Sequence, residues 1–175
     1  MSLPPGKDNV CVSCEFEQNL GIIREIYFFS TMPLEIVKVL AYLCAREDFK
    51  AGDYLFQQGD DDGRAFYFVS GRAGLVCSEE DTDHVVRHVE EGEFLGGLSL
   101  LGNMPRLFSL KTLTDTTCLI LTREKFKKAA ERYPEIMPKI IQSVIKGIRD
   151  WERKFFLSHA MGCNDCRRNL GVSLI

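Results

Sequence analysis

The chain has 175 residues, of which 45% are hydrophobic and 27% charged, and its formal net charge is −3 at pH 7. This length allows one domain with its own core but not two full domains. Proteins that bind nucleic acid usually carry a basic patch or stripe, and the net negative charge does not indicate one. Because no apolar run approaches the roughly 20 residues of a membrane-spanning helix, and the first residues lack the order of a secretory signal, we predict a cytoplasmic protein that contacts neither a membrane nor, by itself, nucleic acid.

Two helices come first along the chain. Apolar residues recur at helical spacing from about Glu15 to Phe29, and a second, shorter helix is expected from Leu34 to Leu43. The pattern then changes to short alternating segments that end in Gly or Asp clusters, which is typical of strands and turns. The expected strands span residues 48–53 (running into a turn), 54–58, 65–69, 73–78, 84–89, 107–113 and 116–122. This arrangement favours an antiparallel β-roll of the double-stranded jelly-roll kind.

The helical period returns after the strands. A helix from Glu124 to Arg132 is followed by a break at Tyr133-Pro134 and a long helix from about Glu135 to Ser158. One face of the long helix carries apolar residues at alternating steps of four and three: Met137, Ile141, Val144, Ile148, Trp151 and Phe155. This spacing is typical of a two-stranded coiled coil, so we predict a parallel homodimer. The alternative is that this face packs on the chain's own roll. A wider stripe that includes Ile136, Ile140 and Ile145 allows both.

The predicted organisation has four parts. They are an N-terminal tail (1–14), a β-roll with N-terminal helices (15–134), the long helix (135–158) and a C-terminal tail (159–175). The fold class is therefore mainly β with flanking helices.

A glycine-rich loop followed by an arginine indicates an anion site. Gly96 and Gly97 allow a sharp turn and a close approach of a ligand to the backbone. Leu98 to Leu101 are expected to form one helical turn, whose free N–H groups favour a negative charge. Arg106, after Pro105, adds a planar guanidinium suited to phosphate oxygens. The alternative is a plain tight turn with a surface arginine.

Three segments together resemble the cyclic nucleotide-binding domain family, which includes catabolite-activator-type regulators, cyclic-nucleotide-dependent kinases and gated channels. The segments are Phe49–Asp60, Phe66–Val76 and Gly92–Leu101, the last followed by Pro105-Arg106. The resemblance implies a β-roll that binds cAMP or cGMP and performs no catalysis. It further implies phosphate contacts from Gly96, Gly97, Leu98, Ser99, Arg106 and Leu107, and contacts to the base from Ser109 and Trp151.

The sequence departs from the family at the pocket. Gly97 stands where the family usually has a Glu that binds the ribose 2′-hydroxyl, and Leu107 stands where it has a small or hydroxylated residue. A lost charge-assisted hydrogen bond costs roughly 1.5–3 kcal/mol. Three alternatives follow: weak binding of a cyclic nucleotide, binding of another small anionic molecule, or a degenerate pocket.

The seven cysteines fall into two groups. Three lie singly in apolar stretches and are expected in the core: Cys44, Cys77 and Cys118. Four form two CxxC pairs at opposite ends of the chain: Cys11, Cys14, Cys163 and Cys166. Four thiolates are enough for a tetrahedral zinc site, so these residues are candidate zinc ligands. Terminal thiols without a metal, and an iron–sulfur regulator that also uses Cys118, are the alternatives.

These observations favour a non-enzymatic ligand-sensing module that signals through its last helix. His84, His88 and His159 have no nucleophile or acid partner at motif spacing, which disfavours an enzyme. The competing hypothesis is a structural or interaction protein, dimeric and zinc-clamped, with a degenerate pocket.

Overall fold

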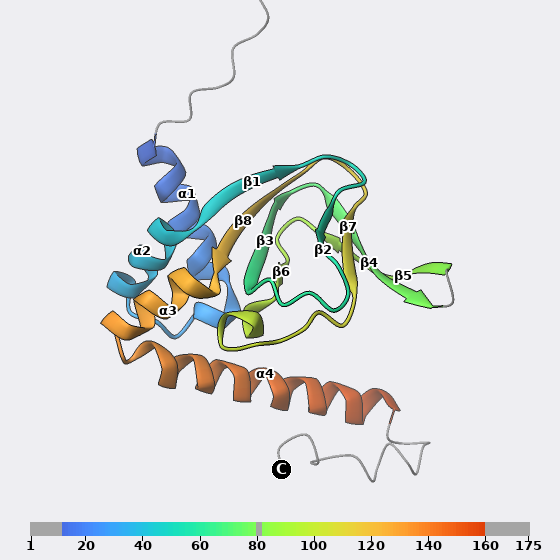
Figure 1. Ribbon diagram of the computed structural model, residues 1–175. Helices are drawn as coiled ribbons and strands as arrows, with labels where there is room; N and C mark the ends of the chain where they lie inside the picture. Colours follow the sequence, from blue (N-terminus) through green and yellow to red (C-terminus); the bar gives the residue numbers. More distant parts are fainter. Residues whose placement is uncertain (1–11, 80–81, 160–175) are drawn as a thin grey trace, which may run out of the picture.

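The computed structural model describes residues 12–79 and 82–159. Its helices, in chain order, are α1 (Val12–Glu25), the short 3₁₀ helix η1 (Tyr27–Phe29), α2 (Leu34–Leu43), the 3₁₀ turn η2 (Gly97–Leu100), α3 (Arg123–Arg132) and α4 (Ile136–His159). Figure 1 shows α1, α2 and α3 gathered at one end of the strands, with α4 running along one side. None of the helices in the described part of the chain is long and apolar enough to cross a membrane.

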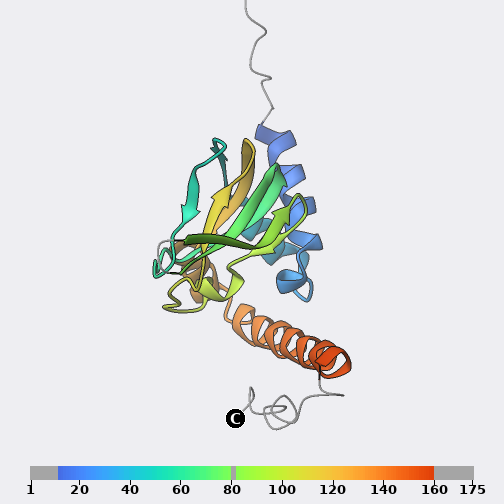
Figure 2. The ribbon, with the colours of Figure 1, turned by 90° about the vertical axis from the view of Figure 1, so that its right-hand side faces the viewer.

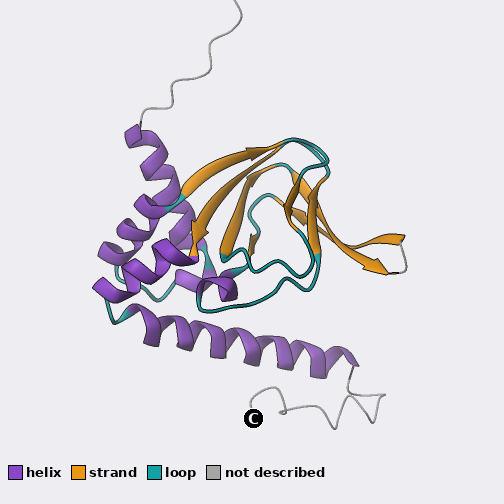
Figure 3. Cartoon of the chain, viewed as in Figure 1, coloured by secondary structure: helices purple, strands orange, loops and turns teal. Residues whose placement is uncertain are grey.

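The strands form two antiparallel sheets that roll against each other. They are β1 (Ala45–Phe49), β2 (Tyr54–Phe56), β3 (Arg64–Ser70), β4 (Arg72–Glu79), β5 (Thr82–Glu90), β6 (Phe94–Leu95), β7 (Ser109–Thr112) and β8 (Thr116–Thr122). One sheet has the order β1-β8-β3-β6 and the other β2-β7-β4-β5. Figures 2 and 3 show this roll of strands with the helices outside it. The predicted fold class, a β-roll with flanking helices, is confirmed.

Strand alternation divides the core in two. Along β8, Cys118 and Ile120 belong to the cluster inside the roll, whereas Leu119 and Leu121 belong to the cluster beneath the helices. Successive side chains of a strand point to opposite faces of its sheet, so a run of consecutive apolar residues serves both layers. The strand 116–122 is therefore buried on both faces.

The helical layer also holds the first part of α4. Ile136 and Ile140 are fully buried in the same cluster as Phe29 of η1 and Phe126 of α3. The break before α4 occurs at Tyr133-Pro134, as the sequence predicts, and the Ile136 N–H donates to the Tyr133 carbonyl. One edge of α4 thus packs on the chain itself, while Ile141 and Ile145 on its other edge are exposed.

Several predicted boundaries differ from the structure. The first strand occupies Ala45–Phe49 rather than residues 48–53, because Ala45 already pairs with Ile120 of β8. β1 is an edge strand, and its polar residues Arg46 to Asp48 hide it from a search for apolar alternation. The two-residue strand β6 was not predicted, because Phe94-Leu95 is too short to show a period.

Other boundaries shift by a few residues. α1 begins at Val12 and ends at Glu25, so the helix expected over residues 15–29 starts earlier and is completed by the separate turn η1. β2 ends at Phe56 because Asp60 accepts the Gln57 N–H and closes a turn there. β7 begins at Ser109, so Leu107 and Phe108 lie before the strand rather than in it.

Candidate functional site

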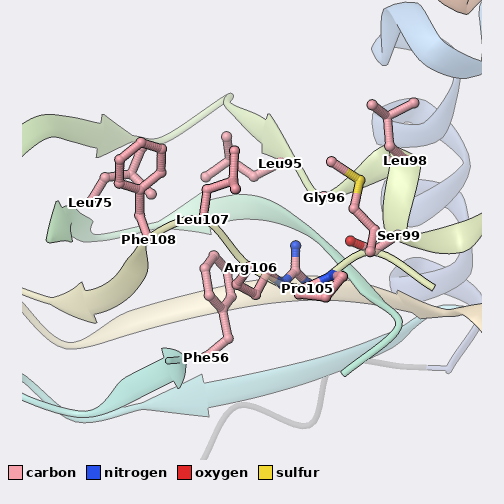
Figure 4. A pocket seen from close by; sticks show the side chains of 12 residues that line it. Phe56, Leu75, Leu95, Gly96, Leu98, Ser99, Pro105, Arg106, Leu107 and Phe108 are labelled. Carbon is pink, nitrogen blue, oxygen red and sulfur yellow. The ribbon is translucent and has the colours of Figure 1, made fainter. Parts of the chain in front are cut away.

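The predicted anion loop forms one wall of a cavity at an open end of the roll. The cavity has a volume of about 250 Å³. The loop side contributes Gly96, Gly97, Leu98 and Ser99, and the segment before β7 contributes Met104 to Phe108. Figure 4 shows Phe56, Leu75 and Leu95 of the roll closing the rest of the wall. The structure therefore brings the six predicted phosphate-site residues (Gly96, Gly97, Leu98, Ser99, Arg106 and Leu107) to a single cavity.

Backbone geometry explains the glycine at position 96. Gly96 has φ +79°, in the left-handed region that other residues rarely adopt. A Cβ built there would lie 2.7 Å from the Arg64 carbonyl oxygen and 2.8 Å from Nη1 of Arg106. Gly96 thus begins the η2 turn and also lets the guanidinium of Arg106 lie against the loop. The turn spans Gly97–Leu100, one residue earlier than predicted.

Arg106 lies at the floor of the cavity and is held by the protein itself. Its side chain is 7% exposed, and Nε and Nη2 donate to Oδ1 of Asp62 at 3.1 and 2.6 Å. Nη2 also donates to the Arg64 carbonyl, and the guanidinium carbon lies 4.1 Å from the centre of the Phe56 ring. The arginine is therefore part of a buried ion pair placed on an aromatic ring, and among the described residues that line the cavity it is the only charged side chain.

A second arginine connects the loop to the helices. Arg123, the first residue of α3, donates from Nε to the Ser99 carbonyl at 2.7 Å and from Nη1 to Oδ1 of Asn103 at 3.2 Å. Its guanidinium also pairs with Asp61, and this hydrogen bond lowers the pKa of the Asp61 carboxyl. Asp61 in turn accepts the Met104 N–H. Both ends of the segment between η2 and Arg106 are thus tied to the start of α3.

Sequence reasoning missed these supporting residues. The sequence identifies the segment with Asp61 and Asp62 only as an acidic turn, and it places Phe56 only in a strand. The two consecutive acidic residues were a detectable signal. The fold brings two arginines close to them, Arg106 after the loop and Arg123 at the start of the following helix. The partners are 44 and 62 residues apart, so no local pattern connects them.

The two residues predicted at the base lie elsewhere. Ser109 is buried, and its Oγ accepts the Gln58 N–H at 2.9 Å, outside the cavity lining. Trp151 is 58% exposed, stacks on Phe155 and lines a neighbouring groove. In this arrangement neither side chain reaches the cavity.

That groove separates η2 from α4. It has a volume of about 450 Å³, and Gly97 and Leu98 line both it and the cavity. Val144, Ile148 and Trp151 form its α4 side, and Phe28 and Phe94 lie opposite. Leu98 therefore lies between the cavity and the groove beside α4.

Of the three cysteines expected in the core, Cys118 is buried, whereas Cys44 and Cys77 are half-buried. Cys118 is fully buried inside the roll, and burial raises the pKa of its thiol to about 12; burial likewise raises the pKa of Cys44 to about 12. Cys14 is exposed on α1. Cys11, Cys163 and Cys166 lie outside the described residues, so the zinc site stays a prediction. Within residues 12–79 and 82–159, no group of three or more potential ligands is placed to hold a metal ion.

Comparison with known proteins relates this geometry to a family. A family model described as the cyclic nucleotide-binding domain matches residues 46–133, just over half of the chain. The chain is 25% identical over 118 residues to the cAMP-dependent protein kinase regulatory subunit of Dictyostelium discoideum, covering 65% of this chain and 34% of that protein. It is 33% identical over 119 residues to the protein of the same name from Emericella nidulans, covering 67% and 28%.

A solved structure supports the fold. The N-terminal domain of a transcriptional regulator from Streptomyces coelicolor A3(2) superposes with a TM-score of 0.67 at 22% identity, covering 76% of this chain and 93% of that one. The chain spans about a third or less of the length of the two kinase subunits it matches. Since the family model covers the roll, the η2 loop and Arg106, the chain belongs to the cyclic nucleotide-binding domain family.

Proposed function

We propose that this chain is a non-enzymatic cytoplasmic sensor that binds a small anion, either cAMP, cGMP or another molecule, in the cavity between η2 and Arg106. The observation that carries the proposal is the cavity itself, which joins the Gly96–Ser99 loop to a buried guanidinium. The names of the two kinase regulatory subunits, which include cAMP, support a cyclic nucleotide as the first ligand to test.

The output of the sensor is α4. A ligand that displaces η2 pushes Leu98 against Val144 and Ile148, and it pulls Arg123 at the start of α3 through the Ser99 carbonyl. A ligand shifts the position of α4 only if it binds the two arrangements with different affinity. The hydrogen bond from Arg123 of α3 to the Ser99 carbonyl, and the groove that Leu98 shares with α4, give the ligand a physical means of doing so.

The single tryptophan of the chain reports this movement. Trp151 lines the groove beside η2, so its fluorescence should change when a ligand displaces the turn. We would titrate the protein with cAMP and with cGMP, recording tryptophan fluorescence and the heat of binding. Arg106→Ala should abolish both signals, whereas Arg72→Ala, which removes an exposed arginine from β4, should leave them unchanged. Binding heat that persists in Arg106→Ala would show that the anion does not lie at this arginine.

We also propose that α4 forms a parallel homodimer through its outer edge. Three apolar residues are exposed there: Ile141 and Trp151 of the predicted four-and-three seam, and Ile145 of the wider stripe. Ile145→Glu should convert a dimer to a monomer in sedimentation velocity experiments. Gln142→Glu adds the same charge at an exposed α4 position and should have no effect. A wild-type protein that sediments as a monomer would refute the dimer.

One observation favours a second candidate, an interaction protein with a degenerate pocket. Asp62 pairs with Arg106 and offsets its charge within the chain itself. This candidate predicts no thermal stabilisation by any small anion, and a zinc clamp would add a loss of stability on chelation. The two candidates are separated by the same titrations.

A further inference from the structure

The cavity is apolar except at one end. Leu75, Leu95, Leu107 and Phe108 lie on one side of Arg106, and the Phe56 ring lies against its guanidinium, as Figure 4 shows. Leu107 is 70% exposed, and Phe108 is also exposed, so both side chains stand at the mouth in water until something covers them. The polar end consists of the guanidinium and the loop that carries Ser99. A ligand that fits this wall has one polar group and a hydrocarbon body.

The polar partners that a nucleoside needs are used elsewhere or missing. Gly97 has no side chain, and a Cβ there would lie 2.9 Å from Cε1 of Phe94 and 3.2 Å from Cδ2 of Phe28. Aromatic rings therefore fill the space into which a sugar-binding side chain would extend. The Ser109 hydroxyl accepts the Gln58 N–H, and Ser109 does not line the cavity. Each buried polar group that stays unpaired lowers affinity by about one to two orders of magnitude, so a nucleoside body is poorly matched to this wall.

The charge at the polar end suits a single negative charge. Asp62 shares the charge of Arg106 through Nε and Nη2. Arg106 donates through Nε and Nη2, and within the described part of the chain Nη1 makes no hydrogen bond. Nη1 lies next to Gly96 of the loop. One terminal NH₂ group is thus left for a carboxylate, while the carboxylate of Asp62 disfavours a ligand with two negative charges.

From these features, and resting on the function proposed above, we infer that the ligand is a small amphipathic monocarboxylate, with its carboxylate at Nη1 of Arg106 and a hydrocarbon body against Phe56, Leu107 and Phe108. The cavity volume of about 250 Å³ is below the range of drug-sized sites, which fits a body of a few methylene groups or one ring. Burial of the exposed Leu107 and Phe108 side chains supplies the driving force.

Calorimetry with a homologous series tests the inference. We would titrate the protein with butanoate, hexanoate and octanoate, with octan-1-ol, and with cAMP and cGMP, each below the concentration at which it forms micelles. Affinity should rise about fourfold for each added methylene until the cavity is filled. Octanoate should bind at least tenfold more tightly than octan-1-ol and than either nucleotide, and it should change the fluorescence of Trp151.

Variants at the mouth avoid the buried ion pair. Leu107→Ser should weaken octanoate binding about tenfold without loss of folding, because the side chain it truncates is mostly exposed. Leu113→Ser, which removes an exposed leucine away from the cavity, is the matched control and should bind as the wild type does. Equal weakening in both variants, or none in Leu107→Ser, would show non-specific binding and overturn the inference.

The remaining outcomes separate this inference from the proposed function. Tighter binding of cAMP or cGMP than of octanoate, lost in Arg106→Ala, would overturn the monocarboxylate and leave the sensor intact. The absence of binding by every probe in the series would overturn the monocarboxylate and favour the interaction protein with a degenerate pocket.

Discussion

The buried pair of Arg106 and Asp62 makes a strong prediction about stability. Asp62→Ala removes the acceptor of two guanidinium hydrogen bonds while Arg106 stays 7% exposed. Removing one partner of a buried ion pair costs about 3–5 kcal/mol, because an uncompensated charge remains buried. The Phe56 ring, 4.1 Å from the guanidinium carbon, still contacts the cation, so we expect the lower end, about 3 kcal/mol.

Thermal unfolding followed by circular dichroism measures this loss. For a domain of this size, 1 kcal/mol corresponds to about 2–4 °C in Tm, so Asp62→Ala should lower the Tm by about 6–12 °C. Lys128→Ala is the control, because it breaks an exposed ion pair with Glu124 that solvent screens and that contributes little to stability. The control should therefore lower the Tm by about 2 °C at most.

A double-mutant cycle shows whether the loss belongs to the pair. Arg106→Ala should cost less than Asp62→Ala, because Asp62 is 18% exposed and keeps the Arg64 N–H as a donor. The double variant buries no unpaired charge, so its loss should be smaller than the sum of the two single losses by at least about 1 kcal/mol. A coupling energy near zero, or a Tm for Asp62→Ala within 2 °C of the wild type, would refute the assignment of a buried ion pair.

Two further predictions concern the loop and the core. Gly96→Ala should destabilise the protein more than Gly92→Ala does. Both glycines have positive φ, but a Cβ meets the Arg64 carbonyl only at position 96. Equal melting temperatures of the two variants would contradict the close approach of Gly96 to that carbonyl. Burial raises the pKa of Cys118 from its ordinary value of 9.0 to about 12, so the unfolded state loses its thiol proton at lower pH than the folded state does. The stability that the buried thiol contributes is therefore complete below pH 9 and is lost as the pH rises toward 12. The unfolding free energy of the wild type should accordingly fall more steeply over this range than that of Cys118→Ala in urea titrations, and parallel slopes would refute it.

Local chemistry made much of the fold predictable. The apolar run within Thr116 to Thr122, the break at Tyr133-Pro134 and the apolar spacing of α4 are each properties of neighbouring residues, and the structure has an element or a break at each. The pair Gly96-Gly97 likewise indicated a turn before any contact was known, because glycine is the residue that adopts positive φ without strain.

The sequence by itself therefore determined the β-roll, the long last helix and the position of the loop, since these depend on the period and conformational preference of adjacent residues. Only the tertiary structure decided that Arg106 is paired with Asp62, that Phe28 and Phe94 fill the space beside Gly97, and that Trp151 lies outside the cavity. These contacts join residues from different parts of the chain, and their geometry is fixed by the packing of the sheets and helices rather than by any local pattern.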